Sequence, residues 1–449
     1  MLQPDQVSTG SSVLEQHSRG ESFDSSVLPE AVVFPESAED VQKVMRLAFE
    51  HAVPVTPVAV NSSLEGHTVP LRGGISLNMT RMNRIVSFEP ENLLVVTQPA
   101  VTYPQINAAT GRSGLFFPVD PGAHASVGGM LMTNASGTMA VRYGVTGDFI
   151  LGLEVVTPTG EVIRTGSKAR KSSSGYNLTR LYCGSEGTLG VVTEVTLRLV
   201  GLPEAASAAR VPFASTEAAT EFVTAVIGGG LPVARCELID GQSIRAVNAH
   251  QGTSYPEEVT IFLEFHGNPE GVRADAALAK ELAESCGATA FESSSDPDER
   301  SVLWEARHNM FYAAVAANPG LRNITTDVTV PIAALPEALS RAQEDCEANG
   351  LKAYTVGHVG DGNFHLAIFF EDDPAAQAKV EAVSHRLVLS ALELHGTSTG
   401  EHGVGIRKLK YMEQEHGAAL SVMRAVKQAL DPKGIMNPGK KLPEEAVSA

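Results

Sequence analysis

Features that mark secreted, zinc-ribbon or membrane proteins are scarce in this sequence. Its 449 residues contain four cysteines, Cys183, Cys236, Cys286 and Cys346, and no CxxC pair. They predict reduced, mostly buried thiols in a reducing compartment rather than a disulfide framework. No apolar run approaches the ~20 residues that a bilayer span needs, and the opening residues lack the basic and apolar regions of a signal peptide. We therefore expect a cytoplasmic protein, with peripheral membrane association as the alternative.

Positive charge is also in short supply. The chain has 34 Lys and Arg against 52 Asp and Glu, which gives a formal net charge of −18. This balance disfavours binding to nucleic acid or to an anionic membrane through bulk attraction. It still permits an anionic small substrate, which needs only a local basic pocket. We expect no nucleic-acid partner and no transmembrane segment.

Common nucleotide-binding motifs are missing as well. No strand-turn-helix unit carries the GxGxxG fingerprint, so a nicotinamide-binding Rossmann domain is not expected. The segment GIMNPGK, from Gly434 to Lys440, contains Pro438 and has no Ser or Thr after its lysine. This composition excludes a P-loop.

The length of the chain exceeds one ordinary core, and two domains are the default expectation, with a third lobe as the alternative. The first residues after about position 30 predict a strand, and Ser37 then caps a helix whose apolar face begins at Val41. Short strands follow, so the first domain is expected to be α+β. After Pro203, alternating strands and helices predict a second α+β domain of split β-α-β units. The expected parts are an extension 1–27, a first domain 28–203, a second domain 204–400 and a closing segment 401–449.

The stretch from Gly114 to Gly147 is rich in glycine and small hydroxylic residues. Glycine costs conformational entropy unless the backbone must approach something closely. A long stretch without clear elements in a compact domain is more often functional than structural. Its backbone N–H groups, together with Ser126, Thr133, Asn134 and Ser136, are suited to wrap a large polar cofactor. The alternative is a set of tight turns.

The segment GHVGDGNFH, from Gly357 to His365, predicts a metal site on a hairpin. Strands are expected on both sides of it, and Asp361-Gly362 is a strong two-residue turn signal. With that turn, His358 pairs directly with His365 and their Cβ atoms lie about 5 Å apart. Both rings then reach one divalent metal. The alternative is a stacked histidine pair without a metal.

A third ligand is expected from STGEHGVG, Ser398 to Gly405. Its glycines allow a tight backbone and the close approach of a bound group. Because adjacent side chains project in different directions, Glu401 can face a metal while His402 faces the substrate. Taken alone, the same pair is compatible with a polar turn.

Segments along most of the chain resemble one family. They are AVVFP, SSLEGH, DPGAHASVGGMLMTNASGTMAVRYG, RKSSSGYNLTRLYCGSEGTLGVVTE, LWEARHNMFYAA, DVTVP, GHVGDGNFH, STGEHGVG and DPKGIMNPGK. Together they resemble the FAD-linked D-lactate dehydrogenases, which have the PCMH-type, vanillyl-alcohol-oxidase-like FAD-binding fold. The near relatives of that family are the glycolate oxidase flavin subunit and D-2-hydroxyglutarate dehydrogenase. The resemblance runs from about Leu28 to Lys441.

The resemblance implies a two-subdomain FAD-binding domain, an α+β cap domain for the substrate, and a final segment that returns to the flavin. One departure concerns the loop before SLEG, where the family usually has glycine. Here the loop is Val60-Asn61-Ser62-Ser63; Asn tolerates a left-handed φ better than most residues, and the serine hydroxyls can still donate. The residues expected to bind FAD are Asn61, Ser62, Ser63, Leu64, Asp120, Ser126, Gly128, Gly129, Asn134, Ser136, Tyr143, Gly144, Asp148, Gly175, Tyr176, Gly187, Val192 and Asn437.

The resemblance also implies an activity, the oxidation of a D-2-hydroxy acid, D-lactate first, to the 2-oxo acid. Arg307 of LWEAR would bind the substrate carboxylate with a bidentate fork, and Arg322 would assist. A divalent metal (zinc, manganese or iron) on the three predicted ligands would acidify the substrate hydroxyl. His402 would take its proton as hydride leaves for the flavin N5.

Electrons would then leave the protein for an external acceptor, because the sequence shows no haem or iron-sulfur motif. The candidates are a cytochrome c, a quinone and an electron-transfer flavoprotein. Glycolate and D-2-hydroxyglutarate are the alternative substrates. Two other functions compete with this one: a metal-dependent hydrolase that uses His358, His365 and Glu401, and a non-catalytic flavin-binding subunit.

Overall fold

The computed structural model describes residues 2–21, 26–122 and 124–444, and the chain divides into two compact units. The first unit comprises Met1–Gly137, Val145–Leu202 and Glu401–Ala449, and the second comprises Thr138–Gly144 and Pro203–Gly400. Both units mix helices with sheets, so the predicted α+β class is confirmed. Among the residues described, no helix combines the length and the apolar character that a membrane span requires.

The first unit holds three sheets. A four-stranded sheet has the order β1-β2-β4-β3, a five-stranded antiparallel sheet the order β5-β6-β10-β8-β9, and a two-stranded sheet pairs β11 with β7. The strands are β1 Val7–Ser8, β2 Ala31–Val33, β3 Val55–Val58, β4 Ile75–Asn78, β5 Ile85–Glu89, β6 Leu94–Thr97, β7 Leu115–Phe116, β8 Ile150–Val156, β9 Val162–Gly166, β10 Val191–Arg198 and β11 Val200–Gly201.

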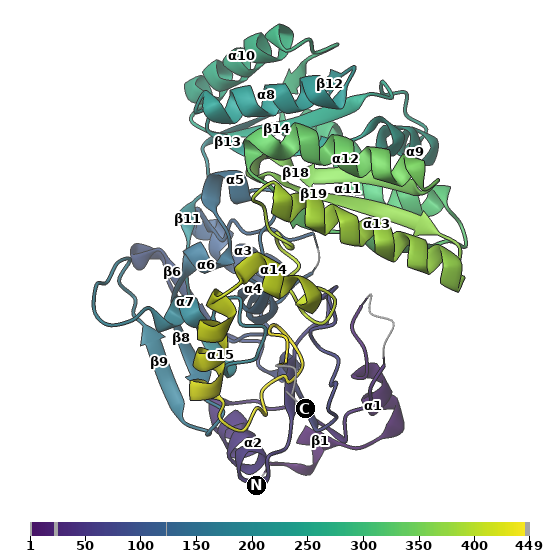
Figure 1. Ribbon diagram of the computed structural model, residues 1–449. Coiled ribbons are helices and arrows are strands. Elements are labelled where there is room, and N and C mark those ends of the chain that lie inside the picture. Colours follow the sequence, from purple (N-terminus) through teal and green to yellow (C-terminus); the bar gives the residue numbers. More distant parts are fainter. Residues whose placement is uncertain (1, 22–25, 123, 445–449) are drawn as a thin grey trace. The chain divides into compact units, whose positions relative to one another are not determined.

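The helices of the first unit are short apart from α2 and α15 (Figure 1). They are α1 Ser11–Gln16, α2 Ala38–His51, α3 Tyr103–Thr110, α4 Val127–Thr133, α6 Thr146–Phe149, α7 Leu178–Tyr182, α14 Met412–His416 and α15 Ala419–Leu430.

Helix α2 forms as predicted. The Ser37 side chain accepts a hydrogen bond from the Asp40 backbone N–H at 3.2 Å, which satisfies one of the unpaired donors of the first turn. Val41 and Met45 are fully buried, because positions four apart share one helix face. The apolar face packs with β3 and β4 in one core cluster.

The second unit is built on one antiparallel sheet with the order β15-β12-β14-β13-β18-β19-β16, and β17 also pairs with β19. The strands are β12 Ala205–Phe213, β13 Val233–Ile239, β14 Val259–Gly267, β15 Glu292–Ser294, β16 Arg322–Thr325, β17 Val328–Thr329, β18 Lys352–His358 and β19 Asn363–Phe370. The helices are α5 Ala140–Tyr143, α8 Thr216–Gly228, α9 Gly241–Gln251, α10 Pro269–Ser285, α11 Pro297–Ala317, α12 Leu335–Ala348 and α13 Pro374–Glu393.

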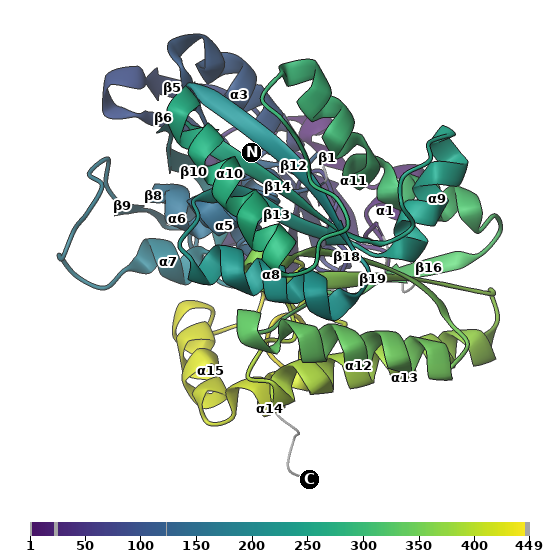
Figure 2. The same ribbon diagram turned by 90° about the horizontal axis from the view of Figure 1, so that it is seen from above.

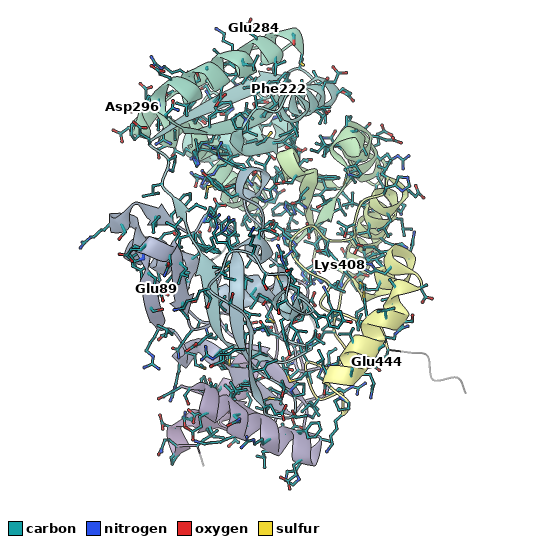
Figure 3. The ribbon with its side chains drawn as sticks, turned by 90° about the vertical axis from the view of Figure 1, so that its left-hand side faces the viewer. Glu89, Phe222, Glu284, Asp296, Lys408 and Glu444 are labelled. Carbon is teal, nitrogen blue, oxygen red and sulfur yellow. The ribbon has the colours of Figure 1, made fainter. Side chains whose placement is uncertain are left out.

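Helices cover both faces of this sheet. Helices α9 and α11 pack on the face that carries Phe262 and Tyr354, and Trp304 of α11 lies against Phe262 with ring centroids 5.8 Å apart. Helix α8 covers the opposite face, where Phe222, labelled in Figure 3, packs against Phe213 with ring centroids 5.3 Å apart. Figure 2 shows α12 and α13 side by side along the same unit.

Some elements have bounds that the sequence does not mark. Helix α7 begins only at Leu178, and the residues from 171 to 177 are not helical. Strands β16 and β17 are separate, and Asp327 lies in the gap between them. Helix α9 was not predicted. Asp240 caps its first turn by accepting from the Ser243 N–H at 2.7 Å, a signal present in the sequence.

The β18–β19 hairpin has a different register from the predicted one. Residues 359–361 form a 3₁₀ turn and Gly362 has φ 77°, so the loop has four residues instead of two. His358 pairs with Asn363, and His365 pairs with Val356. The shift is two residues, and because side chains alternate with a period of two, both histidines still project from the predicted face.

Gly362 generates a stability prediction. A Cβ atom at Gly362 would run into the carbonyl oxygen of Val330, whereas at Gly350 (φ 63°) it would meet open space. Gly350→Ala is expected to cost about 1–2 kcal/mol, the backbone strain alone. Gly362→Ala adds a backbone clash and is expected to cost more than about 3 kcal/mol. Thermal melting of the two variants checks this, and equal melting temperatures would contradict it.

Candidate active site

A cavity of about 810 Å³ lies within the first unit. Its wall combines residues from β3 and the loop after it, from α4, from the turn before β10, and from the C-terminal segment. This volume lies in the range of cofactor-binding pockets. Of the predicted FAD contacts, those that line the cavity are Asn61, Ser62, Ser63, Leu64, Ser126, Gly128, Gly129, Gly187, Val192 and Asn437.

The cavity wall has the properties that a dinucleotide cofactor needs. Glycines at four wall positions allow the backbone to come close to a ligand: Gly128, Gly129, Gly187 and Gly190. Two buried polar atoms in the wall, Ser63 Oγ and His67 Nδ1, have no hydrogen-bond partner among the described residues. Buried polar atoms are nearly always paired, so these two fit a polar ligand. The wall residues therefore fit FAD.

In the loop after β3, an asparagine takes a conformation that few non-glycine residues tolerate. Asn61 has φ 60°, so it adopts the left-handed conformation in place of a family glycine. Its Oδ1 accepts from Thr68 Oγ1 at 2.5 Å and its Nδ2 donates to the Arg19 carbonyl at 3.0 Å. These two bonds hold the loop that opens onto the cavity.

The fully buried carboxylate of Glu186 ties the C-terminal segment to this wall. It accepts from the backbone N–H groups of Val404 and Gly405 at 2.8 and 2.9 Å. His67 Nε2 lies 3.4 Å from it and Lys441 Nζ 3.3 Å. Burial acts to raise the pKa of Glu186, but these charges and hydrogen bonds outweigh it and lower the pKa to about 2. The carboxylate is ionised and stabilises the fold of the segment.

Asn437 makes a second tie between the same parts of the chain. Its Nδ2 donates to the carbonyls of His67 and Glu186 at 3.0 and 2.7 Å, and its Oδ1 accepts from Lys440 Nζ at 2.7 Å. Burial lowers the pKa of Lys440 to about 7, although Glu186 acts against it. Three segments distant in sequence thus meet at one side chain.

Glu401 and His402 also line the cavity. The Ser136 hydroxyl donates to Glu401 Oε2 at 2.7 Å. His402 Nδ1 lies 3.7 Å from the buried carboxylate of Glu65, and Lys408, labelled in Figure 3, lies 3.6 Å from the same oxygen. Burial acts to raise the pKa of Glu65, but Lys408 and His402 leave it below its usual value. A charged carboxylate therefore faces the imidazole.

Other predicted FAD residues do not line the cavity. Asn134 Oδ1 accepts from the Gly147 N–H at 2.9 Å, and Asp148 binds the Val145 N–H and Arg180, so both stabilise local turns. Ser136 binds Glu401, and Asp120 lies against Gly137. Gly175 and Tyr176 lie in an exposed loop, where Tyr176 is 96% exposed. Tyr143 and Gly144 belong to the second unit, where the Tyr143 hydroxyl lies 2.9 Å from His266 Nδ1.

In the second unit, His358 and His365 lie together with ring centroids 5.6 Å apart and planes at 83°. His358 Nδ1 donates to Glu237 Oε1 at 2.7 Å, and His365 Nδ1 donates to the Thr326 carbonyl at 2.8 Å. Neither acceptor carries a proton, so each neutral imidazole is fixed in the tautomer whose lone pair is on Nε2. This is the usual arrangement of metal-ligating histidines.

Arg307 is paired with the same buried carboxylate. Its Nε and Nη2 donate to Glu237 Oε2 at 2.9 and 2.6 Å. Glu237 is fully buried, and burial acts to raise its pKa, but His358 and Arg307 outweigh this and leave the pKa below its usual value. Because the guanidinium is bound along its Nε edge, Nη1 remains as a donor edge for a carboxylate ligand.

Asp327 holds the last part of the second unit. Its Oδ1 accepts from Asn363 Nδ2 at 2.8 Å, and its Oδ2 accepts from Thr399 Oγ1 at 2.7 Å and from the Gly400 N–H at 2.9 Å. His365 Nδ1 lies 3.8 Å from the same side chain. The segment that leads to residue 401 is therefore anchored beside His365. Glu401 itself begins the last segment of the first unit, so a metal site that includes it stays a prediction.

Arg322 lies away from the histidine pair. It pairs with Phe370 on β19 and lies 3.1 Å from Asp372. His365 lies five positions before Phe370 on β19, which is about 17 Å at the usual rise per residue. The backbone of Arg322 is therefore well separated from that of His365, and a role for Arg322 in substrate binding stays a prediction.

Sequence reasoning missed the buried carboxylates Glu65, Glu186, Glu237 and Asp327, and also His67. A signal was available for Glu237, which lies in the strand Val233–Ile239 (VARCELI), where Arg235 is the only other charged residue. Buried Glu and Asp are rare unless they are paired. Glu186 lies inside a glycine-rich motif with φ 55°, and nothing in its spacing indicates its partners.

Comparison with known proteins gives consistent family matches. Residues 202–441 match FAD linked oxidases, C-terminal domain, and residues 29–166 match FAD binding domain. A probable mitochondrial D-lactate dehydrogenase of Danio rerio is 40% identical over 97% of this chain and 89% of its own length. The mitochondrial D-lactate dehydrogenase [cytochrome] of Arabidopsis thaliana is 40% identical over 93% of this chain and 74% of its own length. The solved structure of 4-ethylphenol oxidase from Gulosibacter chungangensis matches 98% of this chain and 95% of its own, with a TM-score of 0.81 and 18% identity. At this identity the match supports the PCMH-type fold and says nothing about function.

The low pKa of Glu186 predicts how the stability of the first unit depends on pH. The unfolded carboxyl, near 4.5, binds protons before the folded one, near 2. The stabilisation is therefore present above pH 4.5 and lost as the pH falls toward 2, by roughly 3 kcal/mol in total. At pH 7 the free energy of unfolding of Glu186→Gln is expected to be lower than that of wild type. This gap between the two free energies should narrow below pH 4.5.

Urea denaturation at a series of pH values measures this gap. Glu91→Gln, at an exposed position of the same unit, is the matched control and should follow the wild type. A gap for Glu186→Gln that stays constant down to pH 2 would contradict the prediction.

Proposed function

Because the chain belongs to the FAD-linked oxidases and is a flavin-dependent oxidoreductase, we propose that it oxidises a D-2-hydroxy acid to the 2-oxo acid. D-Lactate is the first candidate, since both relatives named above are D-lactate dehydrogenases. The observation that carries the proposal is the cavity of the first unit, which fits FAD and has His402 in its wall.

FAD would be held by the loop after β3, by α4 and its preceding loop, by the turn at Gly187 and by Asn437. Backbone N–H groups in these glycine-rich turns suit the pyrophosphate without a basic cluster, which agrees with the scarcity of positive charge. When bound, FAD supplies a two-electron acceptor for the hydrogen that leaves the substrate Cα as hydride.

Arg307 is proposed to bind the substrate carboxylate through its Nη1 edge. The bond pair to Glu237 fixes the plane of the guanidinium, so little side-chain entropy is lost on binding. The side chain is 16% exposed, which leaves one edge accessible to a small ligand. The proposal assigns no role to Arg322.

A divalent cation is proposed at His358, His365 and Glu401. The two histidines present Nε2 lone pairs, and Glu401 directly follows Gly400, whose N–H is bound to Asp327. Two imidazoles and a carboxylate suit zinc, manganese or iron. When bound, the cation would make the substrate hydroxyl more acidic.

His402 is proposed to accept the hydroxyl proton. Its Nδ1 faces the Glu65 carboxylate, which favours the tautomer with Nδ1 protonated and a basic Nε2. Glu65 lies in the loop after β3, and Lys408 Nζ lies 3.6 Å from the same carboxylate oxygen. The electrons then pass to an external acceptor, for which a cytochrome c, a quinone or an electron-transfer flavoprotein is proposed. The Arabidopsis relative is of the cytochrome type by name.

Anaerobic mixing with substrate tests the proposed reaction. The FAD-loaded protein is expected to lose its flavin absorbance on addition of D-lactate and to keep it with L-lactate. A panel with glycolate and D-2-hydroxyglutarate ranks the alternative substrates by rate. If no D-2-hydroxy acid bleaches the flavin, the proposed function is wrong.

The role of His402 is tested by His402→Ala. The rate of flavin reduction is expected to fall by about 10²–10⁴-fold, the usual contribution of a general base, while the flavin content stays unchanged. His416→Ala, in the same C-terminal segment but outside the cavity wall, is the control and should reduce at the wild-type rate. A His402→Ala rate near that of the control removes His402 from the mechanism.

A further inference from the structure

We propose that Glu237 is a positioning residue that holds the substrate-binding arginine and a metal-ligating histidine in one fixed arrangement. The inference rests on the proposed function, because it takes Arg307 and His358 in the roles given above. It adds a residue that contacts neither substrate nor metal and that controls both binding events.

The geometry divides the two oxygens of one carboxylate between two partners. Glu237 Oε2 accepts from Nε and Nη2 of Arg307 at 2.9 and 2.6 Å, and Oε1 accepts from His358 Nδ1 at 2.7 Å. The three residues come from β13, α11 and the end of β18, which lie together in the second unit (Figure 1). Glu237 is fully buried, so water does not compete for these bonds.

The bond to His358 sets the properties of the ligand nitrogen. A carboxylate on Nδ1–H fixes the ring orientation, keeps the proton off Nε2 and makes Nε2 more basic. His365 Nδ1 has a neutral backbone carbonyl as its hydrogen-bond acceptor at 2.8 Å, and the nearest Asp327 oxygen lies further away, at 3.8 Å. His358 is therefore the more strongly polarised of the two imidazoles, and it depends on Glu237 for that.

The bond pair to Arg307 supplies a countercharge as well as an orientation. A buried guanidinium close to a divalent cation is repelled by it, and an ionised carboxylate between the two reduces this cost. Glutamine at position 237 would have the same size but only one acceptor oxygen and no charge. Its oxygen could still accept from Arg307, but its amide N–H₂ would then face His358 Nδ1 and favour the tautomer with Nε2 protonated, which cannot bind a metal.

The test measures metal affinity and substrate binding in separate assays. The FAD-loaded protein is treated with a chelator, freed of it and titrated with Zn²⁺ by calorimetry, and KM and kcat for D-lactate are measured after metal is restored. Glu237→Gln is expected to weaken Zn²⁺ binding about 10–100-fold and to raise KM, while the flavin content stays unchanged.

Arg307→Lys supplies a second measurement that does not remove a buried charge. Lysine cannot make the paired bonds to one oxygen, so Glu237 loses its anchor. Zn²⁺ binding is expected to weaken several-fold although residue 307 is not a metal ligand. If Arg307 acts on the metal only through Glu237, Arg307→Lys should not weaken Zn²⁺ binding any further in the Glu237→Gln background. A double-mutant cycle measures this coupling.

Asp240→Asn is the matched control. Asp240 is a buried carboxylate at the end of the same strand, and it accepts from the N–H groups of Ser243 and Thr355. It has no hydrogen bond to Arg307 or His358 among those described, so Zn²⁺ affinity and KM should stay at wild-type values.

The outcomes separate the inference from the proposed function. If wild type binds Zn²⁺ and Glu237→Gln binds it equally well with an unchanged KM, the inference is wrong and the proposed function stands. If Glu237→Gln does not fold, unchanged Zn²⁺ affinity in Arg307→Lys overturns the inference. If wild type binds no divalent cation, the proposed metal site fails and the inference fails with it.

Discussion

The candidate active site depends on the buried carboxylate of Glu186. This side chain binds two backbone N–H groups of a segment more than 200 positions away in sequence, and two basic side chains lie within 3.4 Å of it. Without a carboxylate there, the amides of Val404 and Gly405 would be buried unpaired, which costs more than the bonds contribute. The segment that carries His402 stays at the cavity because this charge is fully satisfied.

The second unit also contains buried carboxylates that link separate elements of the chain at its sheet. Glu237 and Asp327 are both buried, and each accepts at least three hydrogen bonds from separate elements. A buried charge with this many partners fixes the relative positions of those partners. In a chain with an excess of acidic residues, carboxylates therefore serve as internal cross-links as well as surface charge.

Local signals predicted local structure well. The cap and apolar face of α2 follow from Ser37 and Val41 because both effects act within one turn of helix. The left-handed Asn61 follows from residue type in the same way. The hairpin was predicted on the correct face but two positions out of register, because a 3₁₀ turn with Gly362 competes with the two-residue turn that Asp361-Gly362 also permits.

Long-range pairings could not be predicted from spacing. No periodicity indicates that Glu237 meets Arg307 and His358, or that Glu186 meets residue 404, because these contacts depend on how whole elements pack. The exposure of Tyr176 could not be predicted either, because burial depends on which other segments pack against a loop.

The first unit is discontinuous in sequence, and this has a consequence for its assembly during synthesis. Its last part, Glu401–Ala449, is made after the whole of Pro203–Gly400. The second unit can fold on the ribosome as soon as residue 400 has emerged. The first unit is complete only when residues 401–449 have also been made. Contacts of such high sequence separation form slowly. The wall of the cavity, to which Glu401, His402 and Asn437 contribute, is therefore complete only when the last part of the chain has been made.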